Sequence, residues 1–157
     1  MPARKARPDL VPLIIADLYE LAGLCRRNGE AVARGVGQTQ ARWQVLSAAS
    51  DAPKTVPQIA RRLGVTRQNV QRIADLLVAE RLAQYAANPD HAGSPHLVLA
   101  EQGRRTLARL TRAARSLHEA LAARLGDVDL ERLRRELHSV RAALASVRRS
   151  TRESEDD

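Results

Sequence analysis

The chain has 157 residues, a formal net charge of +8 at pH 7 and a pI near 11, and this length suits one domain with a sizeable core. The basic excess, which is mostly arginine, points to an anionic partner, either nucleic acid or an anionic membrane surface. The single cysteine excludes an intramolecular disulfide framework, and neither a signal peptide nor a run of about 20 apolar residues is present, so we expect a cytoplasmic protein outside the membrane.

Two helices are predicted in the first third of the chain. The first covers residues 10–33, where apolar side chains recur at helical spacing until small residues and glycines end the helix. Its stripe comprises Ile14, Leu18, Leu21 and Cys25. The second helix covers residues 39–50, begins at the N-cap Thr39 and turns Trp43 and Leu46 inward.

Residues 55–82 predict two short helices around a tight turn. Thr55 and Gln58 have the spacing of a capping box at the start of the first helix. Gly64 stands where the chain leaves that helix, at a position where a positive φ is expected. Thr66 then caps the second helix. The predicted inward face of the second helix comprises Val70, Ile73, Leu76 and Leu77.

The outward face of this second helix carries arginines and amides, where a solvated helix usually mixes lysine with glutamate. It comprises Arg67, Gln68, Gln71, Arg72 and Asp75. Arginine can bind guanine and Asn or Gln can bind adenine in the major groove, and a helix N-terminus favours phosphate. The spacing of helix, glycine turn and helix therefore predicts a DNA-binding helix-turn-helix, with a polar surface helix on a small core as the alternative.

A two-stranded hairpin is expected after the helix-turn-helix. Residues 82–86 and 96–99 have the character of short strands, and turn-forming residues lie between them. A hairpin directly after a recognition helix is a wing. Such a wing would place the segment from Asn88 to His96 beside the phosphate backbone or the minor groove.

Two long helices are predicted to complete the chain. The first covers residues 101–124 with a leucine-rich stripe, and Gly126 closes it. In the last helix apolar residues alternate at spacings of three and four: Leu130, Leu133, Leu137, Val140, Leu144 and Val147. This pattern is an a/d seam of nearly three heptads. It predicts pairing with a second chain, with packing on its own domain as the alternative.

This order of elements resembles the MarR family of winged-helix transcription regulators. The matching pieces are residues 40–46, 59–70, 88–90 and 99–103. The resemblance implies a mainly α fold with a small β-hairpin wing. It further implies that residues 10–33 and 101–150 form dimerisation helices and that residues 39–100 form the winged helix-turn-helix lobe.

The resemblance also implies a function, namely a homodimer that places two recognition helices in successive major grooves of a pseudo-palindromic operator. Members usually repress transcription and release DNA when a small phenolic or other lipophilic ligand binds between the dimerisation helices and the DNA-binding lobe. The residues assigned to that pocket are Trp43, Tyr19 and Leu46. The residues assigned to bases are Arg67, Gln68, Gln71 and Arg72, with Asn69 also at the DNA. The residues assigned to phosphates are Thr66, Arg61, Arg62 and Lys54.

The wing departs from the family pattern, which has an acidic residue and arginines near the tip. Here those positions read His91, Ala92 and Gly93, so the arginine expected in the minor groove is missing. His91 could partly substitute for it in a pH-dependent way. The departure leaves a second possibility open, a winged-helix protein-interaction module without DNA binding.

Other chemistry finds little support in the sequence. Cys25 lies beside Arg26 and Arg27, which favours a reactive thiolate and a redox sensor; a buried inert cysteine in the apolar stripe is the alternative. The four histidines lack ligand spacing, so no metal is expected. No phosphate-binding glycine loop or nucleophile elbow is present, and we predict neither a cofactor nor enzyme activity.

Overall fold

The computed structural model describes residues 7–153 of the chain, with side chains described over residues 8–147. The elements in chain order are α1 (Arg7–Arg34), α2 (Gln40–Ala48), β1 (Lys54–Thr55), α3 (Val56–Leu63), α4 (Arg67–Ala79), β2 (Ala83–Ala86), β3 (His96–Leu99), α5 (Glu101–Ala113), α6 (Arg115–Leu125) and α7 (Leu130–Glu153). The chain divides between Ser116 and Leu117 into two compact units, and the winged helix-turn-helix lies in the first.

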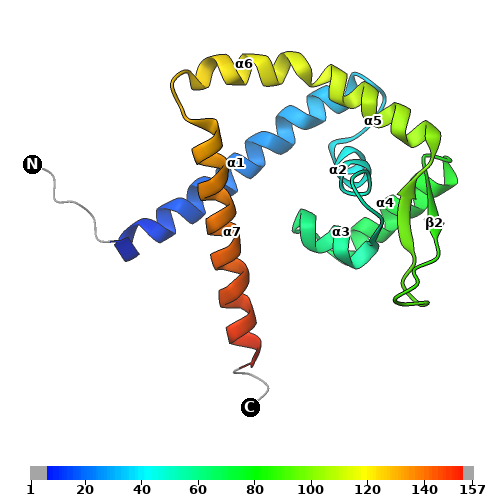
Figure 1. The fold of residues 1–157 in the computed structure, drawn as a ribbon. Helices are drawn as coiled ribbons and strands as arrows, with labels where there is room; N and C mark the ends of the chain where they lie inside the picture. Colours follow the sequence, from blue (N-terminus) through cyan, green and yellow to red (C-terminus); the bar gives the residue numbers. More distant parts are fainter. Residues whose placement is uncertain (1–6, 154–157) are drawn as a thin grey trace, which may run out of the picture. The chain divides into compact units, whose positions relative to one another are not determined.

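The core of the first unit lies among α2, α3, α4, β3 and α5, with the end of α1 against it (Figure 1). Each of these elements contributes at least one fully buried or nearly fully buried side chain, among them Ala33, Leu46, Ile59, Leu77, Leu97 and Leu110. Trp43 packs partly buried against this core, so the inward direction predicted for Trp43 and Leu46 is confirmed. Leu76 is 43% exposed, and its predicted inward direction is wrong because Ile73 and Leu77 already fill that face of α4.

Short-range capping interactions begin each helix of the helix-turn-helix, and all of the predicted caps are confirmed. The Thr55 hydroxyl accepts from the Gln58 backbone N–H, and the Gln58 side chain accepts from the Thr55 N–H. Thr66 accepts from the Asn69 N–H and starts α4. Gly64 ends α3 at φ +67°, a left-handed conformation that costs glycine no steric clash. Local sequence therefore determines where α3 stops and α4 starts.

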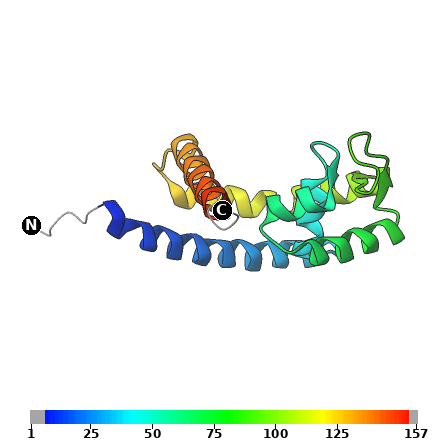
Figure 2. The same ribbon diagram turned by 90° about the horizontal axis from the view of Figure 1, so that it is seen from below.

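The wing is a three-stranded antiparallel sheet in the order β1-β3-β2, one strand more than the predicted hairpin. The two predicted strands pair as expected, with Ala83 opposite Leu99 and Ala86 opposite His96. The added strand β1 has only two residues, so no alternating pattern could mark it. Its residue Thr55 is also the N-cap of α3, and β1 therefore ties the start of the helix-turn-helix to the wing. The loop between β2 and β3 projects from the lobe in both ribbon views (Figures 1 and 2).

The helix predicted over residues 101–124 is interrupted at Ala114 and forms α5 and α6 instead. Ala114 is fully buried, and no glycine or proline stands at the interruption to mark it in the sequence. At the other end of α5, the backbone of Gly103 packs on the Leu82 carbonyl so closely that a Cβ would overlap the oxygen. This contact joins α5 to the start of β2.

The apolar residues of α1 and α7 remain largely in solvent. In α1 the exposed apolar side chains include Leu10, Val11, Leu13, Ile14, Ile15, Leu21 and Leu24. In α7 they include Leu130, Leu133, Leu137 and Leu144, at exposed fractions from 38% to 51%. Both helices therefore carry apolar stripes that the monomer leaves accessible.

Candidate nucleic-acid interface

The exposed face of α4 carries the predicted base-reading side chains. Arg67, Gln68, Gln71 and Arg72 are all exposed, and the opposite face is buried. The buried residues of α4 are Val70, Ile73, Ala74 and Leu77. The structure thus brings the four predicted side chains together on one solvent-facing surface of the first two turns.

Asn69 points a different way from its neighbours. It is partly buried and lines a cavity on the inner side of α4. Its Oδ1 accepts a hydrogen bond of 3.3 Å from Nη2 of Arg72. Asn69 therefore connects the cavity wall with an exposed arginine of the outward face.

Gln71 is held by two residues that the sequence did not single out for a role at the interface. Its Nε2 donates to Oδ1 of Asp75 and to the hydroxyl of Tyr85 on β2, each at 2.8 Å. The Tyr85 hydroxyl donates to the same Asp75 oxygen at 2.6 Å. Burial and the hydrogen bond to Asp75 raise the pKa of Tyr85 to about 12. No short-range pattern could reveal this cluster, because Tyr85 comes from a strand ten residues beyond Asp75.

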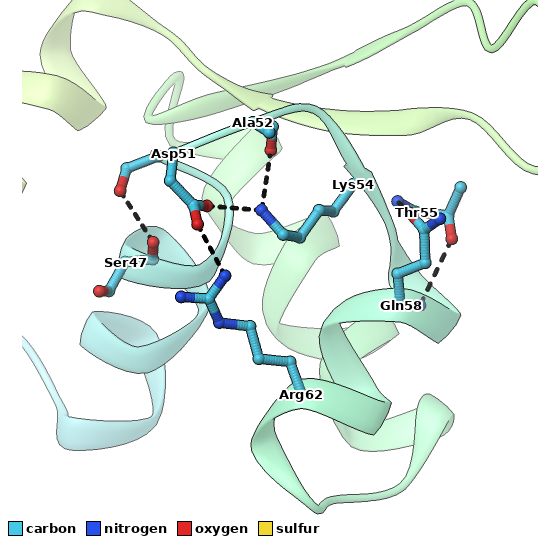
Figure 3. Close-up of polar contacts among 8 residues, drawn as sticks. Ser47, Asp51, Ala52, Lys54, Thr55, Gln58 and Arg62 are labelled. Carbon is cyan, nitrogen blue, oxygen red and sulfur yellow. Dashed lines mark hydrogen bonds and ion pairs between the residues drawn. The ribbon is translucent and has the colours of Figure 1, made fainter. Parts of the chain in front are cut away.

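The basic residues around α3 are partly neutralised (Figure 3). Asp51 accepts from Nζ of Lys54 at 2.5 Å and from Nη1 of Arg62 at 2.7 Å. These two hydrogen bonds hold the pKa of the Asp51 carboxyl well below its usual range. Two of the four predicted phosphate ligands therefore already share an acidic partner. Arg61 is exposed and makes no ion pair among the described residues, and Thr66 is exposed at the start of α4.

The wing loop is shaped by its own hydrogen bonds. Asn88 accepts from the Asp90 N–H and donates from Nδ2 to the Ser94 carbonyl at 2.8 Å. His91 lies at the exposed tip between these contacts. The structure thus places the predicted residue at the tip of the wing, where no arginine accompanies it.

A cavity of about 790 Å³ lies between α1, α2 and the helix-turn-helix. Its lining includes apolar side chains such as Val45, Leu63, Val65 and Ile73, and polar ones such as Arg26, Arg27, Glu30 and Gln44. None of the three residues assigned to a pocket lines it: Leu46 is fully buried in the core, Tyr19 is 77% exposed, and Trp43 packs against the core. The neighbouring residue Val45 faces the cavity in place of Leu46, since successive helical residues point about 100° apart.

Cys25 also lines this cavity and is exposed. Within the single chain Cys25 is therefore not buried, contrary to the alternative, because its stripe lies on the solvent-accessible face of α1. The redox function proposed for Cys25 remains a prediction.

The wall of the cavity joins α1 to α2 through polar contacts. Oε2 of Glu30 accepts from the backbone N–H of Gln40 at 2.7 Å, and its other oxygen accepts from Arg34. The backbone donor first and Arg34 second lower the pKa of Glu30. A Cβ on Gly29 would overlap the side-chain amide of Gln40, so a larger residue at this position would displace that side chain.

Within residues 7–153, no helix has the length and apolarity that crossing a membrane requires. The same part of the chain holds no group of three or more His, Cys, Asp or Glu side chains arranged to bind a metal ion.

Sequence comparison places the chain among known proteins. Residues 36–92, which run from just after α1 into the wing loop, match the family model of the MarR family. Relatives from Mycobacterium tuberculosis and Mycobacterium bovis, each described as an uncharacterized protein, are 50% identical to the chain over 140 residues. The match covers 89% of this chain and 98% of each relative.

Solved structures share the fold. The transcriptional regulator BldR of Sulfolobus solfataricus superposes with a TM-score of 0.74 at 17% identity, over 88% of this chain and 99% of its own. The M. tuberculosis regulator MosR in complex with DNA gives 0.68 at 21% identity, over 85% and 97%. The transcriptional repressor CouR bound to a 23-mer DNA duplex gives 0.62 at 26% identity, over 91% and 99%.

Proposed function

The chain belongs to the MarR family of winged-helix transcription regulators, which are DNA-binding proteins without enzyme activity, and we propose that it is a sequence-specific repressor acting as a homodimer. The observation that carries the proposal is the outward face of α4. Its arginines and glutamines are exposed on a helix whose opposite face is anchored in the core. These side-chain types are suited to reading base edges in a major groove.

The exposed apolar stripes of α1 and α7 support the homodimer. A second chain that covered the exposed leucines of α7 would remove apolar surface from water. Each Å² of apolar surface buried in this way would stabilise the dimer by about 25 cal/mol. The a/d spacing of these leucines is suited to helix-helix packing. Two paired chains would present two copies of α4 to half-sites about one helical turn apart.

The cavity beside α4 supports release of DNA by a small molecule. Its apolar side chains favour a lipophilic or phenolic body, and Arg26 and Arg27 at its wall favour an anionic substituent. Asn69 belongs both to this wall and to the hydrogen bond with Arg72. A ligand that engages Asn69 would therefore disturb an arginine of the DNA-reading face.

Selection of duplexes from a random pool, followed by gel shifts on the selected site, tests this function. Arg67→Ala and Arg72→Ala should each weaken binding by about tenfold or more, since a good base contact contributes about 1–3 kcal/mol. Arg109→Ala is the matched control, because it removes the same charge from an exposed position of α5. Failure of the wild type to select any duplex at low salt would overturn the proposal.

A protein-interaction module is the second candidate, and the wing tip is the observation that favours it. His91, Ala92 and Gly93 offer no arginine to the minor groove. The same selection separates the two functions, because a module of this kind would bind no duplex at any salt concentration. The redox alternative is tested by measuring DNA affinity with and without peroxide in wild type and in Cys25→Ser. If Cys25 is a redox sensor, peroxide changes the affinity of the wild type but not that of the variant.

A further inference from the structure

Gln71, Asp75 and Tyr85 form a closed triangle of hydrogen bonds between the recognition helix and the wing. The Gln71 Nε2 donates to Asp75 and to Tyr85, and Tyr85 donates to Asp75. Gln71 and Asp75 lie one turn apart on α4, and Tyr85 reaches them from β2. Gln71 is thus held by two partners, whereas the Gln68 side chain on the same face has no such hydrogen bonds among the described residues.

The chemistry of the triangle fixes which end of the Gln71 amide faces inward. The carboxylate of Asp75 only accepts hydrogen bonds, so the amide atom that approaches it must be the nitrogen. That nitrogen donates to both Asp75 and Tyr85, so its hydrogen bonds are directed to the protein. No described donor reaches the Oε1 of Gln71, and the side chain is exposed. The atom of the Gln71 amide that has no protein partner among the described residues is therefore its acceptor, Oε1.

We propose that Gln71 reads one base of each half-site through its Oε1 acceptor only and so selects adenine or cytosine at that position. Adenine N6 and cytosine N4 are the amino donors of the major groove, whereas guanine O6 and thymine O4 are acceptors that would face the Gln71 oxygen without a hydrogen bond. A free glutamine would instead bind adenine through both of its amide atoms. The inference rests on the proposed DNA-binding function and adds a specificity-determining contact to it.

Tyr85 is the positioning residue in this arrangement. Its hydroxyl accepts one Gln71 hydrogen and donates to Asp75, so loss of the hydroxyl frees one donor of the amide. The phenol is protonated at neutral pH and able to donate, and burial and Asp75 raise its pKa further, to about 12. Removal of this hydroxyl should restore the two-atom contact with adenine and so favour adenine over cytosine.

The test is the base-preference profile obtained by duplex selection with wild type, Gln71→Ala and Tyr85→Phe. We expect one position per half-site where the wild type accepts adenine and cytosine but rejects guanine and thymine by about tenfold. Gln71→Ala should abolish the preference at that position alone. Tyr85→Phe should convert it to a preference for adenine over cytosine of about tenfold. Gln102→Ala, at an exposed glutamine of α5, is the matched control for Gln71→Ala and should change nothing.

The outcomes separate the inference from the function beneath it. A wild-type protein that selects no duplex overturns the proposed function and the inference with it. A wild-type protein that binds DNA but requires adenine alone, or guanine or thymine, at the position sensitive to Gln71→Ala overturns only the inference. The inference alone is also overturned if Tyr85→Phe keeps its DNA affinity and melting temperature and has the same base-preference profile as the wild type. The wild-type profile and Gln71→Ala decide the matter even if Tyr85→Phe folds poorly.

Discussion

The winged helix-turn-helix lobe and the last helix are both leucine-rich, yet they use their leucines in opposite ways. In the lobe, Leu46, Leu77, Leu97 and Leu110 are fully buried within one chain. In α7, the leucines at heptad positions remain 38–51% exposed. The lobe thus encloses its own core, whereas α7 carries a surface that only another apolar surface can cover. The comparison separates the part of the chain that folds on itself from the part suited to assembly.

The largest expected effect tests this difference directly. Leu77→Ala should lower the free energy of unfolding by about 2–5 kcal/mol, because it leaves a cavity in a closed core. Leu137→Ala should instead abolish the dependence of melting temperature on protein concentration that a dimer shows. Thermal unfolding at several protein concentrations measures both. If both variants lowered the melting temperature equally and at every protein concentration, the distinction between a closed core and an assembly surface would be contradicted.

Gly103→Ala tests how tightly the lobe is closed. In an open helix this change would be favourable by about 1 kcal/mol, because alanine has the higher helix propensity. Here a Cβ would overlap the Leu82 carbonyl oxygen, and we expect a net loss of about 1–3 kcal/mol in the free energy of unfolding. Chemical denaturation measures it, with Gly93→Ala in the exposed wing loop as the control. A stabilised Gly103→Ala variant would show that α5 is not packed as described.

The ion pair between Arg42 of α2 and Glu80 at the end of α4 should make the lobe sensitive to acid. The Arg42 hydrogen bonds to the carboxylate lower the pKa of Glu80. A lowered folded-state pKa contributes stability above the unfolded value of about 4.3, and that contribution is lost as pH falls through the folded pKa. Arg42→Met should therefore cost about 1 kcal/mol at pH 7 and progressively less toward pH 3.

Melting curves of wild type and Arg42→Met between pH 3 and 7 measure this difference. Arg109→Met is the control, because Arg109 makes no ion pair among the described residues. A difference between wild type and Arg42→Met that stays constant across this pH range would contradict the assignment.

The smallest expected effect concerns the charge of the lobe. Asp51→Asn removes the carboxylate that Lys54 and Arg62 share, and both cations become available to phosphate. We expect DNA affinity to rise a few fold at about 0.1 M salt and the slope of log affinity against log salt to steepen by about 1. Gel shifts over a salt series measure both quantities, with Asp127→Asn as a control for charge alone. An unchanged slope would show that Lys54 and Arg62 do not contact the DNA phosphates.

The sequence by itself was sufficient to predict the parts of the fold that depend on residues close together in the chain. The caps at Thr55 and Thr66, the left-handed Gly64 and the two longer wing strands were all predictable, because each depends on residues a few positions apart. The amphipathic pattern of α4 likewise identified its exposed arginines and glutamines. These are the features that a short segment determines through its own hydrogen bonds and its own periodicity.

Only the tertiary structure decided the contacts between distant segments. The strand β1 forms because β3 pairs with it. The break between α5 and α6 falls at Ala114, whose side chain is buried, and no helix-breaking residue stands there. The cavity lining and the bond from Tyr85 to Asp75 also join elements that are remote in the chain. The residue type shows that an amide or an acid can form hydrogen bonds. Packing decides which partner it bonds, because the core determines which donors and acceptors lie within about 3 Å of one another.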